Sequence, residues 1–235
     1  MNLYASIGDD LLSKILDGTY ELGQTIPTEM ELAASYGVSR STIRQALQSL
    51  VSTGYLEKRK RRGTIVTRPK VDQSFAMGIA SFEDDMRRLG RSASTNVIAL
   101  KRTGAQGEVA DALGLPQGQE VYKLVRLRSV DGQPNVFVES YVPALPYPGL
   151  DEVDLERTSL YDAMDGCGRP VATARRRLEV TKADATTAAL LDVEVGDPLY
   201  LFHTVARDEG GTPVEYSVAT YHGQSNSFEF EVTRR

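Results

Sequence analysis

The stretch GVSRSTIRQALQSLVSTGYLEKRKRRGTIV, residues 37–66, combines an amphipathic helix, two short strand patterns and a row of cations. Apolar residues recur at the spacing of one helical face, and Gly54 ends the pattern. That apolar face consists of Ile43, Ala46, Leu47 and Leu50. Residues 55–57 and 64–66 have the composition of short strands, and the five cations 58–62 connect them. The order predicts a helix followed by a basic β-hairpin, or wing.

The residues before the wing predict a second short helix beside the first. Thr28 is a suitable N-cap, and Glu31, three residues later, completes a capping-box pattern. Gly37 is a suitable C-terminal stop, and Ser39 can cap the helix that follows. Two short helices joined by a tight turn are the layout of a helix-turn-helix. A further helix is predicted over residues 3–16 from its apolar spacing.

Polar side chains occupy the N-terminal end of the second helix, away from its apolar face. In a helix-turn-helix this end reaches base edges in the major groove, where arginine can donate two hydrogen bonds to guanine. Hydroxyl groups there can contact phosphates, and a cationic wing suits the phosphate backbone or the minor groove. The candidate DNA-binding residues are Thr28, Ser39, Arg40, Ser41, Thr42, Arg44, Lys60, Arg61, Arg62 and Gly63.

Alternatives stay open for several of these residues. Thr28 and Ser39 can act as structural caps without touching DNA. Gln45 can contact adenine or remain solvated, and a basic loop can simply be a solvated surface. A bare helix-turn-helix can also serve as a packing motif in an enzyme, but the cationic wing favours DNA binding.

The charge of the chain is divided unevenly. The 235 residues carry a net charge of −5 and are 41% hydrophobic and 25% charged, an ordinary balance for a globular protein. Residues 1–70 hold 10 Lys/Arg against 7 Asp/Glu, a net charge of +3, and the remainder holds 17 against 25, a net charge of −8. This asymmetry predicts two domains with different partners.

Composition also argues against several other classes of protein. No apolar run is long enough for a membrane span, and the N-terminus lacks the basic segment of a signal peptide. Cys167 stands alone, which excludes an intramolecular disulfide and fits the cytoplasm; we expect an inert loop thiol. His203, His222 and this cysteine cannot form a zinc cage, so no metal and no cofactor are expected. His203 lies on an apolar strand and is expected to belong to the core.

Residues 68–74, RPKVDQS, are predicted to link the domain 1–67 to a second domain, 75–235. The second domain contains short helix patterns and two long hairpins, whose turns contain DGQP and GGTPVE. Each hairpin follows a short helix, so this unit is repeated. SFEFEVTR, residues 227–234, is expected to close the sheet. Mostly antiparallel strands with intervening helices predict an α+β fold.

Alternation along strands suggests where a ligand binds. Residues i and i+2 share a face, so Arg126 and Arg128 form one pair, and Arg175 and Arg177 form another. Two arginines on one face repel each other unless an anion lies between them, which suits a phosphate or a carboxylate. The alternative is that they form cross-strand ion pairs on an exposed face.

Acidic and aromatic residues on other strands complete the candidate effector site. Glu139 and Glu215 can accept hydrogen bonds from sugar hydroxyls or an amine. Tyr141 and Tyr221 can form an apolar wall with a polar tip. Glu215, close to the turn residue Pro213, can also be structural.

PTEMELA, GVSRSTIRQALQSL, GYL and RRGTIV, in this order and spacing, resemble the DNA-binding domain of the GntR family of bacterial transcription regulators. The resemblance covers nearly all of residues 3–67 and implies a winged helix-turn-helix. It matches Arg40 and Arg44 to arginines that contact bases or phosphates, and Gly63 to the wing-tip glycine. Met30 departs from an arginine and Arg61 from a second glycine that are frequent in the family.

SFEDDMRRLG, the two hairpins and YHGQSNSFEFEV make residues 75–232 resemble the UTRA domain of the HutC branch of that family. The resemblance implies a chorismate-lyase-like fold that binds an effector without converting it. The residues it places in the pocket of sugar-phosphate sensors are Arg126, Arg128, Glu139, Tyr141, Glu215 and Tyr221. His222 and Gln224 stand where relatives often have arginine and aspartate, which bears on the class of ligand.

Three functions follow from these patterns. The first is a homodimeric regulator, expected to be a repressor, that binds palindromic double-stranded DNA and is released by a small anion such as a sugar phosphate. The second is a lyase-type enzyme with a DNA-binding appendage, which rests on fold analogy alone. The third is an architectural DNA binder, which the paired arginines of the acidic domain disfavour. We expect the first, without enzymatic activity.

Overall fold

The computed structural model describes residues 3–59, 62–67, 70–72 and 81–229. Contacts divide the chain into two compact units, Met1–Val71 and Asp72–Arg235. The division falls inside the segment 68–74 that the sequence predicts as a linker, and most of that segment lies outside the described residues. The short strand β3, Val71–Asp72, contains the division.

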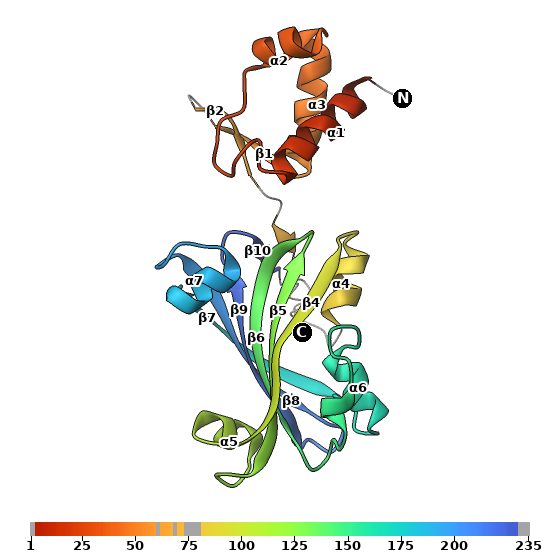
Figure 1. Ribbon diagram of the computed structural model, residues 1–235, viewed down its shortest axis with the longest axis vertical. Helices are drawn as coiled ribbons and strands as arrows, with labels where there is room; N and C mark the ends of the chain where they lie inside the picture. Colours follow the sequence, from red (N-terminus) through yellow and green to blue (C-terminus); the bar gives the residue numbers. More distant parts are fainter. Residues whose placement is uncertain (1–2, 60–61, 68–69, 73–80, 230–235) are drawn as a thin grey trace, which may run out of the picture. The chain divides into compact units, whose positions relative to one another are not determined.

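The N-terminal unit consists of three helices and a β-hairpin (Figure 1). Its elements are α1 (Leu3–Leu16), α2 (Glu29–Tyr36), α3 (Arg40–Ser52), β1 (Leu56–Arg59) and β2 (Gly63–Val66). The two strands pair antiparallel from Leu56 opposite Val66 to Arg59 opposite Gly63. The expected strands, 55–57 and 64–66, differ from these by one or two residues. Strand β1 begins at Leu56 and includes Lys58 and Arg59, because these pair with Thr64 and Gly63 of β2.

Local chemistry explains where the helices begin and end. The Thr28 hydroxyl accepts a hydrogen bond from the Glu31 amide, and the Glu31 carboxylate accepts one from the Thr28 amide at 2.8 Å. Gly37 ends α2 in the left-handed conformation, with φ of 65°. The apolar face of α3 is buried against α1, α2 and the wing strands. The predicted helix-turn-helix and wing are thus one packed unit.

A six-stranded antiparallel sheet forms the centre of the C-terminal unit (Figure 1). Its strands are β4 (Ala93–Gly104), β5 (Glu120–Val130), β6 (Gln133–Pro143), β7 (Thr173–Lys182), β8 (Pro198–Arg207) and β9 (Pro213–His222). Their order is β4-β5-β6-β9-β8-β7, so the hairpins β5–β6 and β8–β9 lie side by side. The predicted α+β fold is confirmed.

The expected closing strand at residues 227–234 was wrong within the described residues. Strand β10 covers only Asn226–Ser227 and belongs to a separate two-stranded sheet. Phe228 and Glu229 carry no strand, and residues 230–235 lie outside the described residues.

Short helices cover both faces of the large sheet. They are α4 (Phe82–Arg88), α5 (Glu108–Leu113), α6 (Leu160–Gly166) and α7 (Ala185–Leu191), with a 3₁₀ turn at Leu150–Glu152. Helix α6 packs on the face that carries Tyr122 and Leu124, the same face over which Phe82 of α4 contacts Arg128. Helices α5 and α7 pack on the opposite face, against Val121 and Leu127 respectively. The two faces of the sheet are therefore covered by different pairs of helices.

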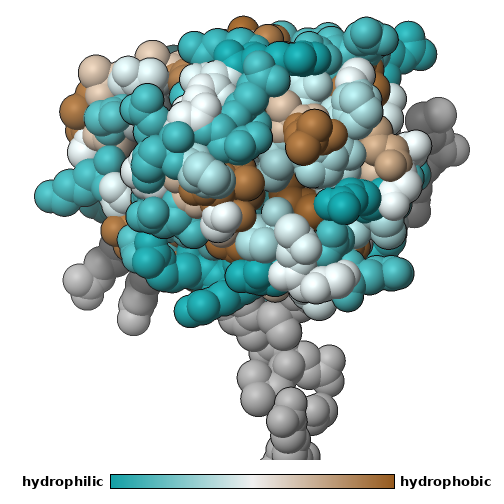
Figure 2. All heavy atoms as spheres, turned by 90° about the horizontal axis from the view of Figure 1, so that it is seen from below, coloured by the Kyte–Doolittle hydropathy of each residue, from teal (hydrophilic) through white to brown (hydrophobic). Residues whose placement is uncertain are grey.

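The surface of the protein is mostly polar where it is seen from below. In this view the hydrophobic residues form small groups separated by hydrophilic ones (Figure 2). Among the described residues, no helix combines the length and the apolar character needed to cross a membrane.

Candidate functional site

The first turn of α3 presents a cluster of small hydroxyl groups next to an exposed arginine. The Ser39 hydroxyl caps α3 by accepting from the Thr42 amide at 3.2 Å. It also lies 2.7 Å from the Ser41 hydroxyl and 2.8 Å from the Thr42 hydroxyl. Arg40 is exposed at the start of the same turn. These polar groups gather at the positive end of a 13-residue helix, which favours an anionic partner such as a DNA phosphate.

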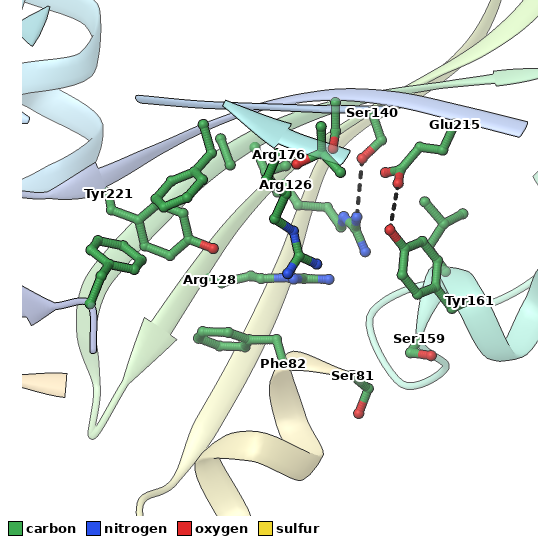
Figure 3. A pocket seen from close by; sticks show the side chains of 17 residues that line it. Ser81, Phe82, Arg126, Arg128, Ser140, Ser159, Tyr161, Arg176, Glu215 and Tyr221 are labelled. Atoms are coloured by element: carbon green, nitrogen blue, oxygen red, sulfur yellow. Dashed lines mark hydrogen bonds between the residues drawn. The ribbon is translucent and has the colours of Figure 1, made fainter. Parts of the chain in front are cut away.

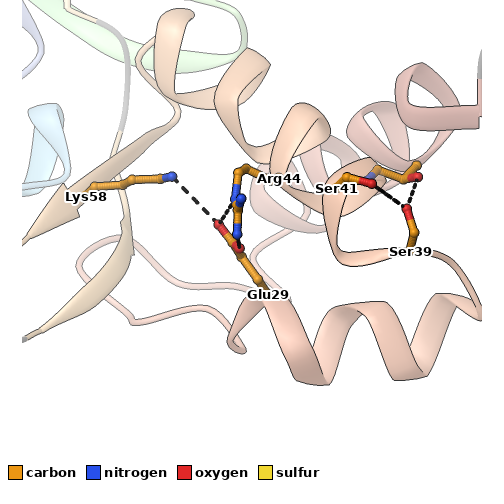
Figure 4. Close-up of polar contacts among 6 residues, drawn as sticks. Glu29, Ser39, Ser41, Arg44 and Lys58 are labelled. Carbon is orange, nitrogen blue, oxygen red and sulfur yellow. Dashed lines mark hydrogen bonds and ion pairs between the residues drawn. The ribbon is translucent and has the colours of Figure 1, made fainter.

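Arg44, one turn further along α3, is held by an acid from α2. Its Nε lies 3.1–3.2 Å from both carboxylate oxygens of Glu29, and its Nη2 lies 2.7 Å from Oε2 (Figure 4). Lys58 of β1 lies 3.8 Å from the same carboxylate. The bond from Arg44, and more weakly Lys58, holds the pKa of Glu29 below its usual value. One carboxylate therefore ties α2, α3 and the wing together.

The tip of the wing is shaped by backbone conformation. Gly63 has φ of 88°, and a Cβ at this position would lie 3.0 Å from the Thr25 side chain. Both facts disfavour any other residue there. Arg62, beside it, is exposed. The other two predicted wing contacts, Lys60 and Arg61, lie outside the described residues.

A cavity opens on the face of the large sheet that α4 and α6 flank (Figure 3). Its empty volume, which includes space open to solvent, is about 760 Å³. Four of the eight predicted effector residues line it: Arg126, Arg128, Glu215 and Tyr221. The other lining residues are Ser81, Phe82, Val138, Ser140, Ser159, Leu160, Tyr161, Arg176, Phe202, Thr204, Ser217, Ala219 and Phe228.

Arg126 is buried in this cavity, with 3% of its surface exposed. Its Nη2 lies 3.4 Å from the Ser140 hydroxyl, while its Nε and Nη1 are buried and have no hydrogen-bond partner. Burial lowers the pKa of Arg126 to about 9, and the nearby charge of Arg128 acts in the same direction. A guanidinium in this setting is costly until an anion accepts its hydrogen bonds.

Arg128 lies next to Arg126 on the same strand face, as alternation predicts. Its guanidinium stacks over the Phe82 ring at 5.2 Å, and its Nε is buried without a hydrogen-bond partner. Figure 3 shows Arg126 and Arg128 pointing into the cavity. Together they offer several N–H donors to one ligand.

The remaining walls of the cavity differ in chemistry. Glu215 is buried and accepts a hydrogen bond from the Tyr161 hydroxyl at 2.8 Å. Burial raises the pKa of Tyr161, and the Glu215 charge adds to this, so the phenol remains a donor. Phe228 makes ring contacts with Phe202 and Tyr221 at 4.7 Å and 5.5 Å. The cavity thus combines a cationic region, an acid and an aromatic wall.

The other four predicted effector residues do not line this cavity. Glu139 forms an ion pair with Lys123 at 2.6 Å, and Tyr141 stacks on Tyr216 with centroids 6.3 Å apart. Arg175 is exposed, and Arg177 pairs with Glu179 at 3.0 Å. All four lie on the opposite face of the sheet, and their contacts are those of a partly exposed polar surface.

His203 also lies on that opposite face and is half-buried, with Nδ1 2.8 Å from the Tyr216 hydroxyl. His222, one of the departures from the family pattern, is buried outside the cavity lining, and its Nδ1 accepts from the Gln224 amide at 3.2 Å. Cys167 is an exposed free thiol after α6. Within the described ranges, no group of three or more His, Cys, Asp or Glu side chains is placed to hold a metal ion.

Reasoning from the sequence missed Arg176, Tyr161 and a line of hydroxyls on the cavity floor. Ser140, Ser217 and Thr204 lie directly opposite one another on β6, β9 and β8. Alternation along each strand would place these three residues on the cavity face only if the register of both hairpins were known. Tyr161 comes from α6, whose position over the sheet no local pattern predicts.

Two family models match the chain, one for each unit. Residues 3–66 match bacterial regulatory proteins of the gntR family, and residues 88–226 match the UTRA domain. The chain is similar to a protein of Shigella flexneri named probable fructoselysine utilization operon transcriptional repressor, with 33% identity over 92% of this chain and 88% of the relative. It is also similar to the transcriptional repressor NagR of Bacillus subtilis, with 30% identity over 96% of this chain and 93% of the relative.

Solved structures show the same architecture. The crystal structure of PhnF from Mycobacterium smegmatis superposes with a TM-score of 0.73 at 30% identity. The match covers 96% of this chain and 99% of that one, so the order of the two units is the same in both.

Proposed function

Because the chain belongs to the GntR family of bacterial transcription regulators and carries a UTRA domain, we propose that it represses genes by binding a palindromic operator. In this proposal a homodimer binds the DNA, and a small anion in the cavity of the C-terminal unit releases it. The chain is a DNA-binding regulator with an effector-binding domain and is not an enzyme.

The exposed groups of the N-terminal unit support the assignment of the DNA contacts. Arg40 and Arg44 extend from the end of α3 that reaches base edges in helix-turn-helix proteins. The hydroxyls of Ser39 and Ser41 suit phosphate oxygens, and Lys58 and Arg62 of the wing add positive charge. Arginine–guanine pairs would provide sequence selectivity, while the wing would provide affinity that is largely independent of sequence.

The observation that carries the effector proposal is the buried guanidinium of Arg126. Two of its three nitrogens lack a hydrogen-bond partner within the protein, and Arg128 adds a second charge. An anion would satisfy both and remove the cost of burying them. We therefore propose an anionic metabolite as the effector.

The rest of the cavity supports a phosphorylated sugar. Ser140, Ser217, Thr204 and Glu215 provide hydrogen-bonding groups for hydroxyls, and the aromatic wall offers an apolar surface for the face of a sugar ring. The Shigella relative is named for the use of fructoselysine, a sugar-derived compound. An organic acid is the second candidate, and it would use the same arginines.

Dimer formation follows from the proposed mode of DNA binding. One winged unit covers one half-site, so a palindrome requires two copies related by a twofold axis. Sedimentation of the purified protein would test this directly, and a monomer at the concentrations that bind operator would contradict it. A regulator of chromosomal genes acts in the cytoplasm, and we propose that location.

Thermal unfolding with a panel of metabolites tests the effector proposal. Each phosphorylated sugar is compared with its unphosphorylated counterpart and with organic acids of similar size. We expect at least one phosphorylated sugar to raise Tm, because a ligand that binds only the native state stabilises it. The increment should vanish in Arg126→Gln and persist in Arg175→Gln. If no anion raises Tm in the wild type, the proposal fails.

A further inference from the structure

The three consecutive arginines of β7 are divided between the two faces of the sheet. Arg176 lines the cavity and lies directly opposite Thr204 of β8. Arg175 and Arg177 alternate to the other face, where Arg177 pairs with Glu179. Of these three arginines, only Arg176 can therefore contact a ligand in the cavity.

Arg176 extends a line of polar groups that crosses the cavity floor. From Thr204 the line continues to Ser217 and Ser140 in the registers of β8–β9 and β6–β9. Arg126 donates to Ser140 from the far side. Arg176 and Arg126 therefore approach one floor of hydroxyl groups from strands on opposite sides of it, and Figure 3 shows both side chains pointing into the cavity.

Electrostatics indicates that Arg176 acts on the interior of the cavity. Burial raises the pKa values of Tyr161 and Tyr221, and the charge of Arg176 opposes this rise at both residues. Tyr161 lies beside Glu215, whereas Tyr221 belongs to the aromatic wall. The charge of Arg176 therefore acts on residues from two different walls of the cavity that it lines.

Charges among the cavity-lining residues do not balance. Three arginines line it, while Glu215 is its one lining acid among the described residues. Two acids of α4 lie nearby: Glu83 accepts from Thr95 at 2.6 Å and its charge also acts on Arg126. Asp85 pairs with Arg88 at 3.1 Å, and the charge of Arg176 acts on it as well. Of the three lining arginines, Arg126 is buried and Arg128 and Arg176 are half-buried, so an anion that carries more than one charge can neutralise a cluster that Glu215 alone does not balance.

We propose that Arg176 contacts the effector and completes a three-guanidinium site with Arg126 and Arg128, and that this site selects a tetrahedral dianion over a monocarboxylate. A phosphate ester group has three free oxygens and about two negative charges, so each guanidinium can receive its own acceptor. A monocarboxylate has two oxygens and one charge, which leaves one guanidinium uncompensated. This inference rests on the proposed anion-sensing function and specifies the residue that sets the charge of its ligand.

Titration of the full-length protein with sulfate and with formate, at constant ionic strength, tests the inference. Sulfate is a tetrahedral dianion and formate a monocarboxylate. We expect Arg176→Gln to weaken sulfate binding about tenfold or more, since a charge-assisted hydrogen bond is lost, and to change formate binding by less than about threefold. Arg175→Gln, which alters the neighbouring residue on the other face, should bind both ions as the wild type does.

A second variant keeps the test decisive if Arg176→Gln folds poorly. Arg176→Lys retains the charge but loses the planar fork, so sulfate binding should fall by less than in the glutamine variant and still measurably. Wild-type sulfate affinity in both variants would overturn the role of Arg176 while leaving anion sensing intact. Absence of any anion binding to the wild type would overturn the proposed function itself, and this inference with it.

Discussion

Arginines serve the two units of this protein in opposite environments. Arg44 of the N-terminal unit is exposed and already has a carboxylate partner, Glu29. Arg126 of the C-terminal unit is 3% exposed and has two nitrogens without a hydrogen-bond partner. The same functional group therefore lies in solvent with an acidic partner in one unit, and inside the protein with incomplete hydrogen bonding in the other.

This difference has an energetic consequence. An exposed ion pair contributes only about 0–1 kcal/mol, so Arg44 can exchange Glu29 for a DNA group at little cost. A buried guanidinium destabilises the ligand-free protein, so the anion that neutralises Arg126 must also stabilise the fold. We expect DNA binding to depend strongly on salt and effector binding to appear as a gain in stability.

The largest expected effect comes from removing the buried charge. Arg126→Met should raise the free energy of unfolding of the ligand-free protein by about 1–3 kcal/mol, because a buried cation without full compensation is replaced by an apolar side chain of similar length. The same variant should lose the rise in Tm that an anion produces. Thermal unfolding with and without sulfate measures both quantities. A less stable variant that keeps its anion response would contradict the contrast between the two units.

On the DNA side, Arg40→Ala should weaken binding to an operator selected from random sequences by about 10- to 100-fold, the loss of one bidentate base contact. Binding to random duplex should change much less. Competition assays with both duplexes give the ratio, and Lys101→Ala, an exposed change in the C-terminal unit, is the control. Equal losses on both duplexes would show that Arg40 contacts phosphate rather than bases.

The wing offers a smaller and different effect. Lys58→Gln and Arg62→Gln should each reduce the slope of log affinity against log salt by about 1, since each removes one phosphate contact. Operator and random duplex should be affected alike. Affinity measured over a series of salt concentrations provides the slope, with Lys101→Gln as the matched control. An unchanged slope in both variants would remove the wing from the DNA contacts.

The smallest effect is expected at Glu29. Glu29→Gln removes a negative charge from the surface that we propose contacts DNA, and it releases Arg44. Random duplex should therefore bind a few-fold more tightly, and the operator-to-random ratio should fall. The pKa of Glu29 is lowered in the folded protein, chiefly by Arg44, so its stabilising contribution is present above the pKa of the unfolded state and is lost as pH falls. Acid unfolding of the wild type and the variant should therefore differ by less than about 1 kcal/mol. A higher operator-to-random affinity ratio in Glu29→Gln would contradict the role of Glu29 in positioning Arg44.

Most of the N-terminal unit could be predicted because its determinants are local. The capping box of Thr28 and Glu31 and the apolar face of α3 lie within a few residues of one another. Glu29 was missed because its partner, Arg44, lies 15 residues away on another helix. Spacing along one helix does not predict such a contact.

The C-terminal site was less predictable because it depends on register. If the β5–β6 hairpin paired without interruption from the Asp131-Gly132 turn, Glu139 would lie opposite Leu124. Glu139 would then share a face of the sheet with Arg126. A β-bulge between Arg128 and Ser129 shifts the pairing by one residue, so Ser140 lies opposite Leu124 instead. The bulge turns Glu139 and Tyr141 to the other face. For β7, the pairing of Arg176 with Thr204 decides which arginine faces the cavity.

The central claim is that an anion held by the buried arginines weakens DNA binding by the exposed ones. Operator affinity, measured with and without the phosphorylated sugar that most raises Tm, tests it most directly. We predict a loss of about 5- to 150-fold in the wild type, the usual range of such coupling, and no change in Arg126→Met. An operator affinity that stays constant while the sugar phosphate occupies the cavity would contradict the account.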